Sequence, residues 1–298
     1  MEVIHFDINN TPKLDEQINL CLGFFDGVHI GHAKLIKAAK LSKGKVGVLS
    51  FESRPRPGSK NRVITKVEDK IEIFKNLGVD YLLLLKVDQE LMDTPYLDFI
   101  NKCLKKINPH ILVMGDDFTF GKDRLGTPLV LKAYFKCKVL SLKRIAHKKI
   151  SSTDIKALIE DGEIETANKL MKREYMITNS PRKGFGKGRE LGFNTVNVPI
   201  GNEYVVPKYG VYLTNNLING VWVYGLTNVG VHPTINKLTE PIIEAHLLNY
   251  STYEEIKEPV KVKFIKFIRP EKHFSSVDTL QKQVLGDIAR IKKYLHMK

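Results

Sequence analysis

The sequence predicts an α/β protein with two domains, a first half built around a parallel β-sheet and a second half built as a small antiparallel β-barrel. In the first half, short apolar runs alternate with segments of helical periodicity, which is the pattern of a parallel sheet covered by helices on both faces. In the second half, strand-like runs follow one another and are separated by Gly, Asn and Pro turns. The length of 298 residues is enough for two domains of ordinary size.

In the first half, five strands are expected at nearly continuous apolar runs, at residues 20–25, 46–51, 81–85, 111–114 and 138–142. Amphipathic helices are expected between them at residues 33–41, 67–77 and 96–105. In parallel sheets, ligands bind at the carboxyl ends of the strands. The loop after the first strong strand is therefore where a ligand site is expected.

A longer helix is expected over residues 152–171, and after Tyr175 the pattern changes to β-strand. The expected barrel strands contain the runs YGVYLT, GVWVYGLTNV, IIEAHLL and VKVKFIKFI. Residues 276–294 then return to a helical period. The boundary is expected between Lys169 and Tyr175, which gives one domain over residues 1–172 and a second over residues 173–298.

Composition limits which binding partners and which cell compartment the sequence predicts. The formal net charge is +14, but the lysines are spread along the chain without a basic block, which argues against nucleic acid as the partner. The N-terminus lacks a signal-peptide pattern, and no apolar run has membrane-spanning length. Cys21, Cys103 and Cys137 are widely spaced and form no CxxC pair, so we expect core thiols in a reducing, cytoplasmic setting.

The loop GFFDGVHIGH, residues 23–32, has the composition of a phosphate cradle. Gly27 and Gly31 allow backbone conformations that let a phosphate approach the main chain. The helix that starts near His32 offers unpaired N–H groups and a positive dipole end. His29 and His32 can reach the same phosphate and stabilise charge that develops on a transferring phosphorus.

Two other interpretations of this loop stay open at this point. A plain strand-to-helix turn that happens to contain two histidines would give the same local pattern. The histidine pair could also bind one metal ion, although no Cys or His cluster in the sequence completes the ligand set.

A second glycine-rich stretch, KGFGKGRELGFNTVNV, opens the barrel at residues 183–198. Its glycines, among them Gly184 and Gly188, form a flexible loop whose amides can approach phosphate oxygens. Thr195 and Asn197 lie two apart on an extended segment and therefore point to the same face. A hydroxyl and an amide oxygen there suit a magnesium ion shared with ATP phosphates.

The loop GFFDGVHIGH resembles the signature of the HxGH nucleotidylyltransferases. Two further stretches, MGDDFTFGKDRLGT and ISSTDIKALIEDG, resemble motifs of the bacterial bifunctional riboflavin kinase/FMN adenylyltransferase (FAD synthetase) family. In that family these motifs jointly hold ATP and FMN, with the HxGH histidines on the phosphates. The resemblance implies a Rossmann-like nucleotidylyltransferase domain in the first half.

By this resemblance, His29 and His32 stabilise the transferring adenylyl group. Ser152 and Thr153 are expected beside the nucleotide phosphates. The other residues that the resemblance places at the flavin or the nucleotide are Gly23, Phe25, Asp26, Gly31, Asp117, Phe118 and Arg124.

The second half resembles the riboflavin kinase part of the same family through GRELGFNTVN, PKYGVY, GLTNVGVHPT, IEAHLLNY and RPEKHF. The resemblance implies a six-stranded antiparallel barrel with a C-terminal helix, and phosphorylation of riboflavin by ATP with Mg²⁺. Glu244 is the expected catalytic base, and Thr195 and Asn197 are the expected magnesium ligands. The residues expected to bind ATP or flavin in this half are Gly184, Gly188, Arg189, Asn228 and Arg269.

Three departures of the first half from the family pattern bear on phosphate binding. Arg54 stands where the family has histidine, and Asp154 and Lys156 stand where it has arginines. Replacing a phosphate-facing arginine by aspartate removes a bidentate donor and adds repulsion. We therefore expect FMN to be made from riboflavin and ATP, and FAD to be made from FMN and ATP by a weakened adenylyltransferase half.

Two alternatives to this bifunctional enzyme stay open. The chain could be a riboflavin kinase whose first domain has decayed into a flavin or nucleotide binder. It could also be a regulatory paralogue that binds flavin or nucleic acid. In the leading interpretation the ligands are riboflavin, FMN, FAD and ATP, the partners include no membrane, and the sequence specifies no oligomeric state.

Overall fold

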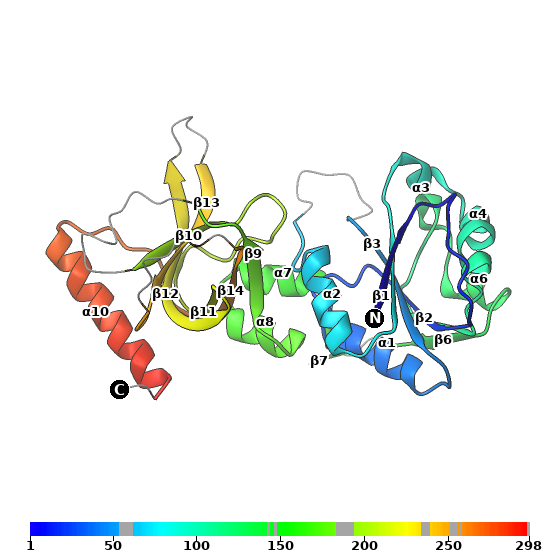
Figure 1. Cartoon of the computed structure of the whole chain (residues 1–298), viewed down its shortest axis with the longest axis horizontal. Coiled ribbons are helices and arrows are strands. Elements are labelled where there is room, and N and C mark those ends of the chain that lie inside the picture. Colours follow the sequence, from blue (N-terminus) through cyan, green and yellow to red (C-terminus); the bar gives the residue numbers. More distant parts are fainter. Residues whose placement is uncertain are drawn as a thin grey trace. The chain divides into compact units, whose positions relative to one another are not determined.

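The computed structural model describes residues 1–53, 62–141, 144–145, 148–182, 194–233, 239–250, 256 and 258–296 (Figure 1). The chain divides into two compact units, Met1–Ser152 and Thr153–Lys298. None of the described helices is both long enough and apolar enough to cross a membrane.

Unit 1 is built on a six-stranded parallel sheet with the strand order β1-β4-β3-β2-β5-β6. The strands are β1 (Glu2–Phe6), β2 (Asn19–Leu22), β3 (Val46–Phe51), β4 (Tyr81–Leu85), β5 (Ile111–Gly115) and β6 (Cys137–Leu140). β3 and β4 lie on one side of β2 and β5 on the other, so the strand order reverses at β2. In an open α/β sheet this reversal marks the crevice in which ligands bind.

Helices cover both faces of this sheet. Leu82 and Leu84 of β4 pack with residues of α1 (Ile30–Lys40) and α2 (Val67–Asn76). Leu83 and Leu85 face the opposite cluster, which contains residues of α4 (Tyr96–Phe99), η1 (Ile100–Leu104) and α6 (Pro128–Lys132). Successive strand residues point to opposite faces, so continuous apolar runs are what a sheet buried on both sides requires. The short elements α3 (Gln89–Asp93), α5 (Lys105–Ile107), η2 (Lys122–Arg124), β7 (Arg144–Ile145) and β8 (Lys148–Lys149) complete this unit.

The predicted parallel sheet is confirmed, with changes at the ends of its elements. The first expected strand stops at Leu22 because the chain turns sharply from Phe25, whose φ is +54°. The helix expected at residues 96–105 is a helical run in which the π-helical turn η1 separates α4 from α5. The edge strand β1 was not expected, since its sequence EVIHF mixes polar and apolar residues.

The helix expected over residues 152–171 is two helices, α7 (Ser152–Glu160) and α8 (Ile164–Met171). Gly162 separates them with φ +83°, a left-handed conformation that ends a helix. α8 is joined to the barrel by Asn168, whose Nδ2 donates to the Phe264 carbonyl (2.8 Å) and whose Oδ1 accepts from Tyr175 N (2.7 Å). These contacts explain why α8 falls within the second compact unit.

Unit 2 contains a six-stranded antiparallel sheet with the order β10-β13-β12-β11-β14-β9. The strands are β9 (Tyr175–Asn179), β10 (Thr195–Pro199), β11 (Gly210–Ile218), β12 (Val221–Pro233), β13 (Thr239–Leu247) and β14 (Val260–Arg269). Just beyond β9, Arg182 N donates to Asn197 O in β10 (2.8 Å), an antiparallel bridge between the two edges of the sheet. The predicted antiparallel barrel is confirmed.

The C-terminal helix α10 (Val277–Tyr294) covers part of the outer surface of this barrel. Its Ile291 belongs to an apolar cluster with Val211, Leu213 and Leu226 of the sheet. Asp287 on the same helix is fully buried, and its carboxylate accepts from Arg269 Nε (2.8 Å) and Gln283 Nε2 (2.9 Å). A buried ion pair therefore joins α10 to the end of β14.

Replacement of Asp287 by alanine is expected to lower the free energy of unfolding of unit 2 by about 3 kcal/mol, because it leaves the Arg269 guanidinium buried and unpaired. The Arg269 side chain is only 11% exposed. The measurement is urea unfolding of the full chain, followed by the fluorescence of Trp222, the single tryptophan of the sequence. Glu165→Ala is the control, because the Glu165–Lys266 pair lies at the surface, where such pairs contribute at most about 1 kcal/mol. Equal losses in the two variants would contradict a stabilising role for the buried pair.

Candidate active sites in the two units

The loop between β2 and α1, residues 23–29, contains His29 and is named the histidine loop. Its backbone is unusual. Phe25 and Val28 have φ of +54° and +34°, and Gly27 between them has φ of +74°. Positive φ is uncommon for residues other than glycine, and most of all for β-branched ones. Such conformations persist only where the surroundings fix them, and they gather at functional sites.

Buried polar contacts fix this loop to its surroundings. The carboxylate of Asp26, only 2% exposed, accepts from the backbone N–H of Ile64 (2.8 Å) and of Thr65 (3.4 Å). Ser152 Oγ donates to the Asp26 carbonyl (2.8 Å), so this serine contacts the histidine loop. Thr153 follows Ser152 on α7, is exposed, and is the first residue of unit 2.

Two further contacts hold the carbonyl of Phe24 in the same loop. It accepts from Ser50 Oγ (2.9 Å) and from Lys70 Nζ (3.1 Å), and the Lys70 ammonium also lies 4.2 Å from the centre of the Phe24 ring. Lys70 is only 1% exposed. Sequence reasoning missed this lysine, because a lysine in a helix with Glu and Asp neighbours has the pattern of a solvated face.

The two histidines stand together at the start of α1. His29 is the N-cap residue: its Nδ1 accepts from Gly31 N (3.1 Å), while His32 Nδ1 accepts from His29 N (3.3 Å). Their rings stack with centroids 3.7 Å apart, and the buried Phe25 ring packs against His32 at 5.0 Å. Because each Nδ1 acts as acceptor, a neutral ring carries its proton on Nε2. Nε2–H is therefore the donor group of each neutral ring.

The helix itself favours an anion at this end. The first turn of α1, all of it described, carries no acidic side chain, and the last turn carries Lys37 and Lys40. The N-terminal dipole end is therefore not neutralised by a neighbouring carboxylate on the helix. Gly23, at the end of β2, and Gly31, in the first turn of α1, flank the loop that leads to this site.

The stretch MGDDFTFGKDRLGT begins at the end of β5, the strand next to the one that leads into the histidine loop. β5 pairs directly with β2, so the loop after Gly115 leaves the same edge of the sheet as the histidine loop. Asp117 in it is exposed, and the half-buried Phe118 ring stacks on Phe120 at 5.8 Å. Arg124 is exposed, and its Nε donates to Thr119 Oγ1 (2.9 Å).

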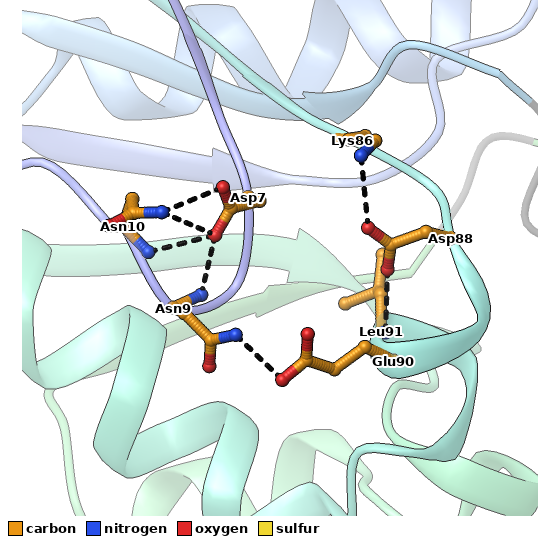
Figure 2. A network of polar contacts seen from close by, with 7 residues as sticks. All are labelled: Asp7, Asn9, Asn10, Lys86, Asp88, Glu90 and Leu91. Carbon is orange, nitrogen blue, oxygen red and sulfur yellow. Dashed lines mark hydrogen bonds and ion pairs between the residues drawn. The ribbon is translucent and has the colours of Figure 1, made fainter.

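A polar network occupies the carboxyl ends of β1 and β4 at the same edge, where no site was predicted. Figure 2 shows its residues, Asp7, Asn9, Asn10, Lys86, Asp88, Glu90 and Leu91. The Asp7 carboxylate accepts from the backbone N–H groups of Asn9 and Asn10, both at 2.9 Å, and from Asn10 Nδ2. Hydrogen bonds from Asn10 lower the pKa of Asp7. Because the donors come from the loop itself, this network stabilises the turn after β1.

In unit 2, the strand register brings the predicted catalytic residues into one row. Asn197 of β10 lies directly opposite Glu244 of β13, and Glu244 lies directly opposite Asn228 of β12. Residues opposite one another in an antiparallel sheet share a face. Thr195 lies two residues before Asn197 on the same face, opposite His246, whose pKa is lowered by burial. One face thus collects a hydroxyl, an amide and a carboxylate.

Two residues at the end of β14 and just after it add further contacts. Asn228 Nδ2 donates to Glu271 Oε1 (3.2 Å), a contact that sequence reasoning missed because 43 residues separate the two. Arg269, which the resemblance places at a ligand, donates through Nε to the buried Asp287 (2.8 Å). Gly184, Gly188, Arg189 and Arg54 lie outside the described residues.

The cysteines and the metal-ligating side chains form no further site within the described residues. Cys21, Cys103 and Cys137 are free thiols. Burial raises the pKa of Cys21 and of Cys103 to about 12, so both are core thiols. Within the described ranges, no three His, Cys, Asp or Glu side chains are grouped so that they could hold a metal ion.

Comparisons with known proteins cover both units. A family model for FAD synthetases matches residues 11–156, and one for riboflavin kinases matches residues 171–295. The bifunctional riboflavin kinase/FMN adenylyltransferase of Bacillus subtilis is 32% identical over 304 residues, covering 96% of each chain. The one from Listeria monocytogenes is 31% identical over 297 residues, covering 95% of this chain and 94% of its own.

The fold also matches a solved structure. A crystal structure from Streptococcus pneumoniae, described as a macrolide-efflux protein, has a TM-score of 0.87 and 26% sequence identity. It covers 96% of this chain and 97% of its own. The similarity therefore includes both units.

Proposed function

Because the chain belongs to the family of the bifunctional riboflavin kinase/FMN adenylyltransferases, we propose that each of its two reactions has its own site in one half of the chain. The chain phosphorylates riboflavin to FMN and adenylylates FMN to FAD, with ATP as co-substrate in both steps. We assign the adenylyl transfer to residues 1–172 and the phosphorylation to residues 173–298.

In the adenylyl transfer, a phosphate oxygen of FMN attacks the α-phosphorus of ATP and pyrophosphate leaves. The stacked pair of His29 and His32 carries this proposal, because two Nε2–H donors next to a helix N-terminus stabilise charge on that phosphorus. Ser152 supports the loop through the Asp26 carbonyl. The residues proposed to line the flavin or nucleotide in this half are Gly23, Phe25, Asp26, Gly31, Asp117, Phe118, Arg124 and Thr153.

In the phosphorylation, Glu244 takes the proton of the riboflavin 5′-hydroxyl, the oxygen attacks the γ-phosphorus of ATP, and ADP leaves. The row Asn197–Glu244–Asn228 supports this assignment, because it sets the base between two polar side chains on one face. We propose Gly184, Gly188 and Arg189 as the phosphate loop of this site.

The oxygen donors Thr195 and Asn197 fit Mg²⁺, which prefers hydroxyl, amide and carboxylate oxygens. When bound with ATP, the ion neutralises charge on the phosphates.

Arg269 has a structural role in this proposal. Since its guanidinium is held by the buried Asp287, we propose that it supports the segment after β14 and does not bind ATP.

The ligands of the protein are small molecules, namely riboflavin, FMN, FAD and ATP, and we propose that it works in the cytoplasm. The thiol state supports this location, because all three cysteines are unlinked. The spread of the lysines argues against nucleic acid as a partner.

One incubation tests the proposal. The full chain, riboflavin, ATP and Mg²⁺ are combined, and riboflavin, FMN and FAD are resolved by chromatography over time. FMN is expected first and FAD more slowly, because Asp154 and Lys156 replace the family's arginines. FMN without any FAD at long times would favour a riboflavin kinase whose first half only binds flavin or nucleotide. No product at all, with flavin or nucleic acid bound, would favour the regulatory paralogue.

Replacement of Gly27 by alanine is expected to lower FAD synthesis about tenfold and to leave riboflavin phosphorylation unchanged. A Cβ there would lie 2.9 Å from Ile64 Cδ1 and would take a φ of +74°, so the histidine loop must shift. The rates of both reactions are measured with FMN or riboflavin supplied separately. Gly44→Ala is the matched control, since Gly44 also has positive φ but its Cβ would meet nothing closer than 3.8 Å. Unchanged FAD synthesis in the Gly27 variant would show that the loop conformation does not matter for the reaction.

A further inference from the structure

Glu271 follows the end of β14 and contacts the proposed catalytic row of unit 2. Its Oε1 lies 3.2 Å from Nδ2 of Asn228, and Asn228 is directly opposite Glu244. Neither the expected catalytic residues nor the expected ligand-binding residues include this carboxylate. The contact places a second carboxylate one side chain away from the proposed base.

The sheet leaves room for this carboxylate at Gly230. Gly230 lies two residues after Asn228 on β12 and therefore on the same face. A Cβ at Gly230 would lie 2.3 Å from Glu271 Oε1 and 3.2 Å from Asn228 Nδ2. Glycine at this position thus lets the Glu271 side chain lie across the strand and reach Asn228.

The chain that carries Glu271 is held in place by α10. Arg269 is paired with the buried Asp287 of that helix, and its second nitrogen donates to the Pro270 carbonyl (3.1 Å). The residue before Glu271 is a proline, which fixes its own φ. The backbone from which the carboxylate reaches Asn228 is therefore anchored.

A carboxylate only accepts hydrogen bonds, so this contact fixes which way the Asn228 amide faces. Nδ2 of Asn228 is on the side of Glu271, and Oδ1 is turned away from it. An amide oxygen accepts from hydroxyl groups, and a polyol chain such as the ribityl chain of riboflavin offers several. We propose that Glu271 is a positioning residue that fixes Asn228 as a hydrogen-bond acceptor for the ribityl hydroxyls beside Glu244. This inference rests on the proposed kinase site.

The test is steady-state phosphorylation by the full chain, with riboflavin and ATP varied separately and the sum of FMN and FAD measured. Glu271→Ala is expected to raise KM for riboflavin about tenfold and to leave KM for ATP within twofold, since one oriented hydrogen bond to the substrate is lost. Lumiflavin, which has the same ring system without the ribityl chain, is added as a competitive inhibitor. Its inhibition constant is expected to stay unchanged.

Gly230→Ala gives the same test by another route, because it displaces the exposed Glu271 carboxylate without removing its charge. It is expected to raise KM for riboflavin as Glu271→Ala does, and the double variant is expected to be no worse than either single one. Glu165→Ala is the control: it removes an exposed carboxylate that is paired with Lys266 and lies outside the row.

The outcomes separate this inference from the assignment of the kinase site. An unchanged KM for riboflavin in both variants would overturn the role of Glu271, and so would a parallel rise of the lumiflavin inhibition constant, which would mean that Glu271 holds the whole pocket. If Glu244→Gln retains wild-type activity, the kinase site itself is wrongly placed, whatever the Glu271 variants do.

Discussion

Replacement of Glu244 by glutamine is expected to lower kcat for riboflavin phosphorylation by a factor of about 10³, because a positioned general base contributes 10²- to 10⁴-fold. Glutamine keeps the size of the side chain and its place between Asn197 and Asn228, but it cannot take the proton of the 5′-hydroxyl. The measurement is FMN formation from riboflavin, ATP and Mg²⁺. FAD formation from supplied FMN is expected to continue at the wild-type rate, since that reaction is assigned to the other half of the chain.

The matched control is Glu240→Gln, four residues earlier on the same strand. Glu240 forms an exposed ion pair with Arg182, so its loss is expected to change the kinase rate by less than a factor of two. A kinase rate within tenfold of wild type in Glu244→Gln would remove Glu244 from the role of base. A parallel loss of FAD synthesis would indicate damage that is not confined to the kinase site.

The second large effect is expected at the histidine pair. Replacing His29 by asparagine is expected to lower FAD synthesis by about 10²-fold or more and to leave FMN synthesis intact. Asparagine is itself a good N-cap and keeps an acceptor for the Gly31 N–H, but it has no counterpart to the Nε2–H donor. The substitution therefore separates the start of the helix from the stabilisation of phosphate charge. His32→Asn is expected to have an effect of the same order.

The rates are measured with FMN and ATP supplied, and helix content is checked by circular dichroism. His110→Asn is the control, since His110 is an exposed histidine of the same unit outside the proposed site. Wild-type FAD synthesis in both His29→Asn and His32→Asn would return the loop to the interpretation of a plain turn with two incidental histidines.

Much of the fold is encoded locally and could be predicted. β3 and β4 occupy the predicted residues because buried parallel strands are uninterrupted apolar runs, a signal that needs no distant partner. The break at Gly162 was not predicted, because the apolar spacing continues on both sides of it and only the backbone conformation shows the interruption. Helical period alone does not distinguish one helix from two joined in line.

The proposed sites were predictable to the extent that their residues are neighbours in the sequence. His29 and His32 share one turn of chain, and Thr195 and Asn197 share one strand face. The contacts that support them are distant: Lys70 lies 46 residues from Phe24, and Glu271 lies 43 residues from Asn228. Such pairs are brought together by packing and strand register, which no window of the sequence contains. Arg269 shows the converse, since a motif arginine was expected at a ligand and is found in a buried ion pair.

The use of His29 as the first residue of a helix has a consequence for how the protein can evolve. Surface loops generally accept insertions at little cost in free energy. Between β2 and α1, however, one added or deleted residue would change which side chain occupies the helix start. Each residue turns the helix by about 100°, so both imidazoles would turn together away from the place that they hold at the helix N-terminus. We therefore expect this loop to tolerate substitutions better than a change in its length.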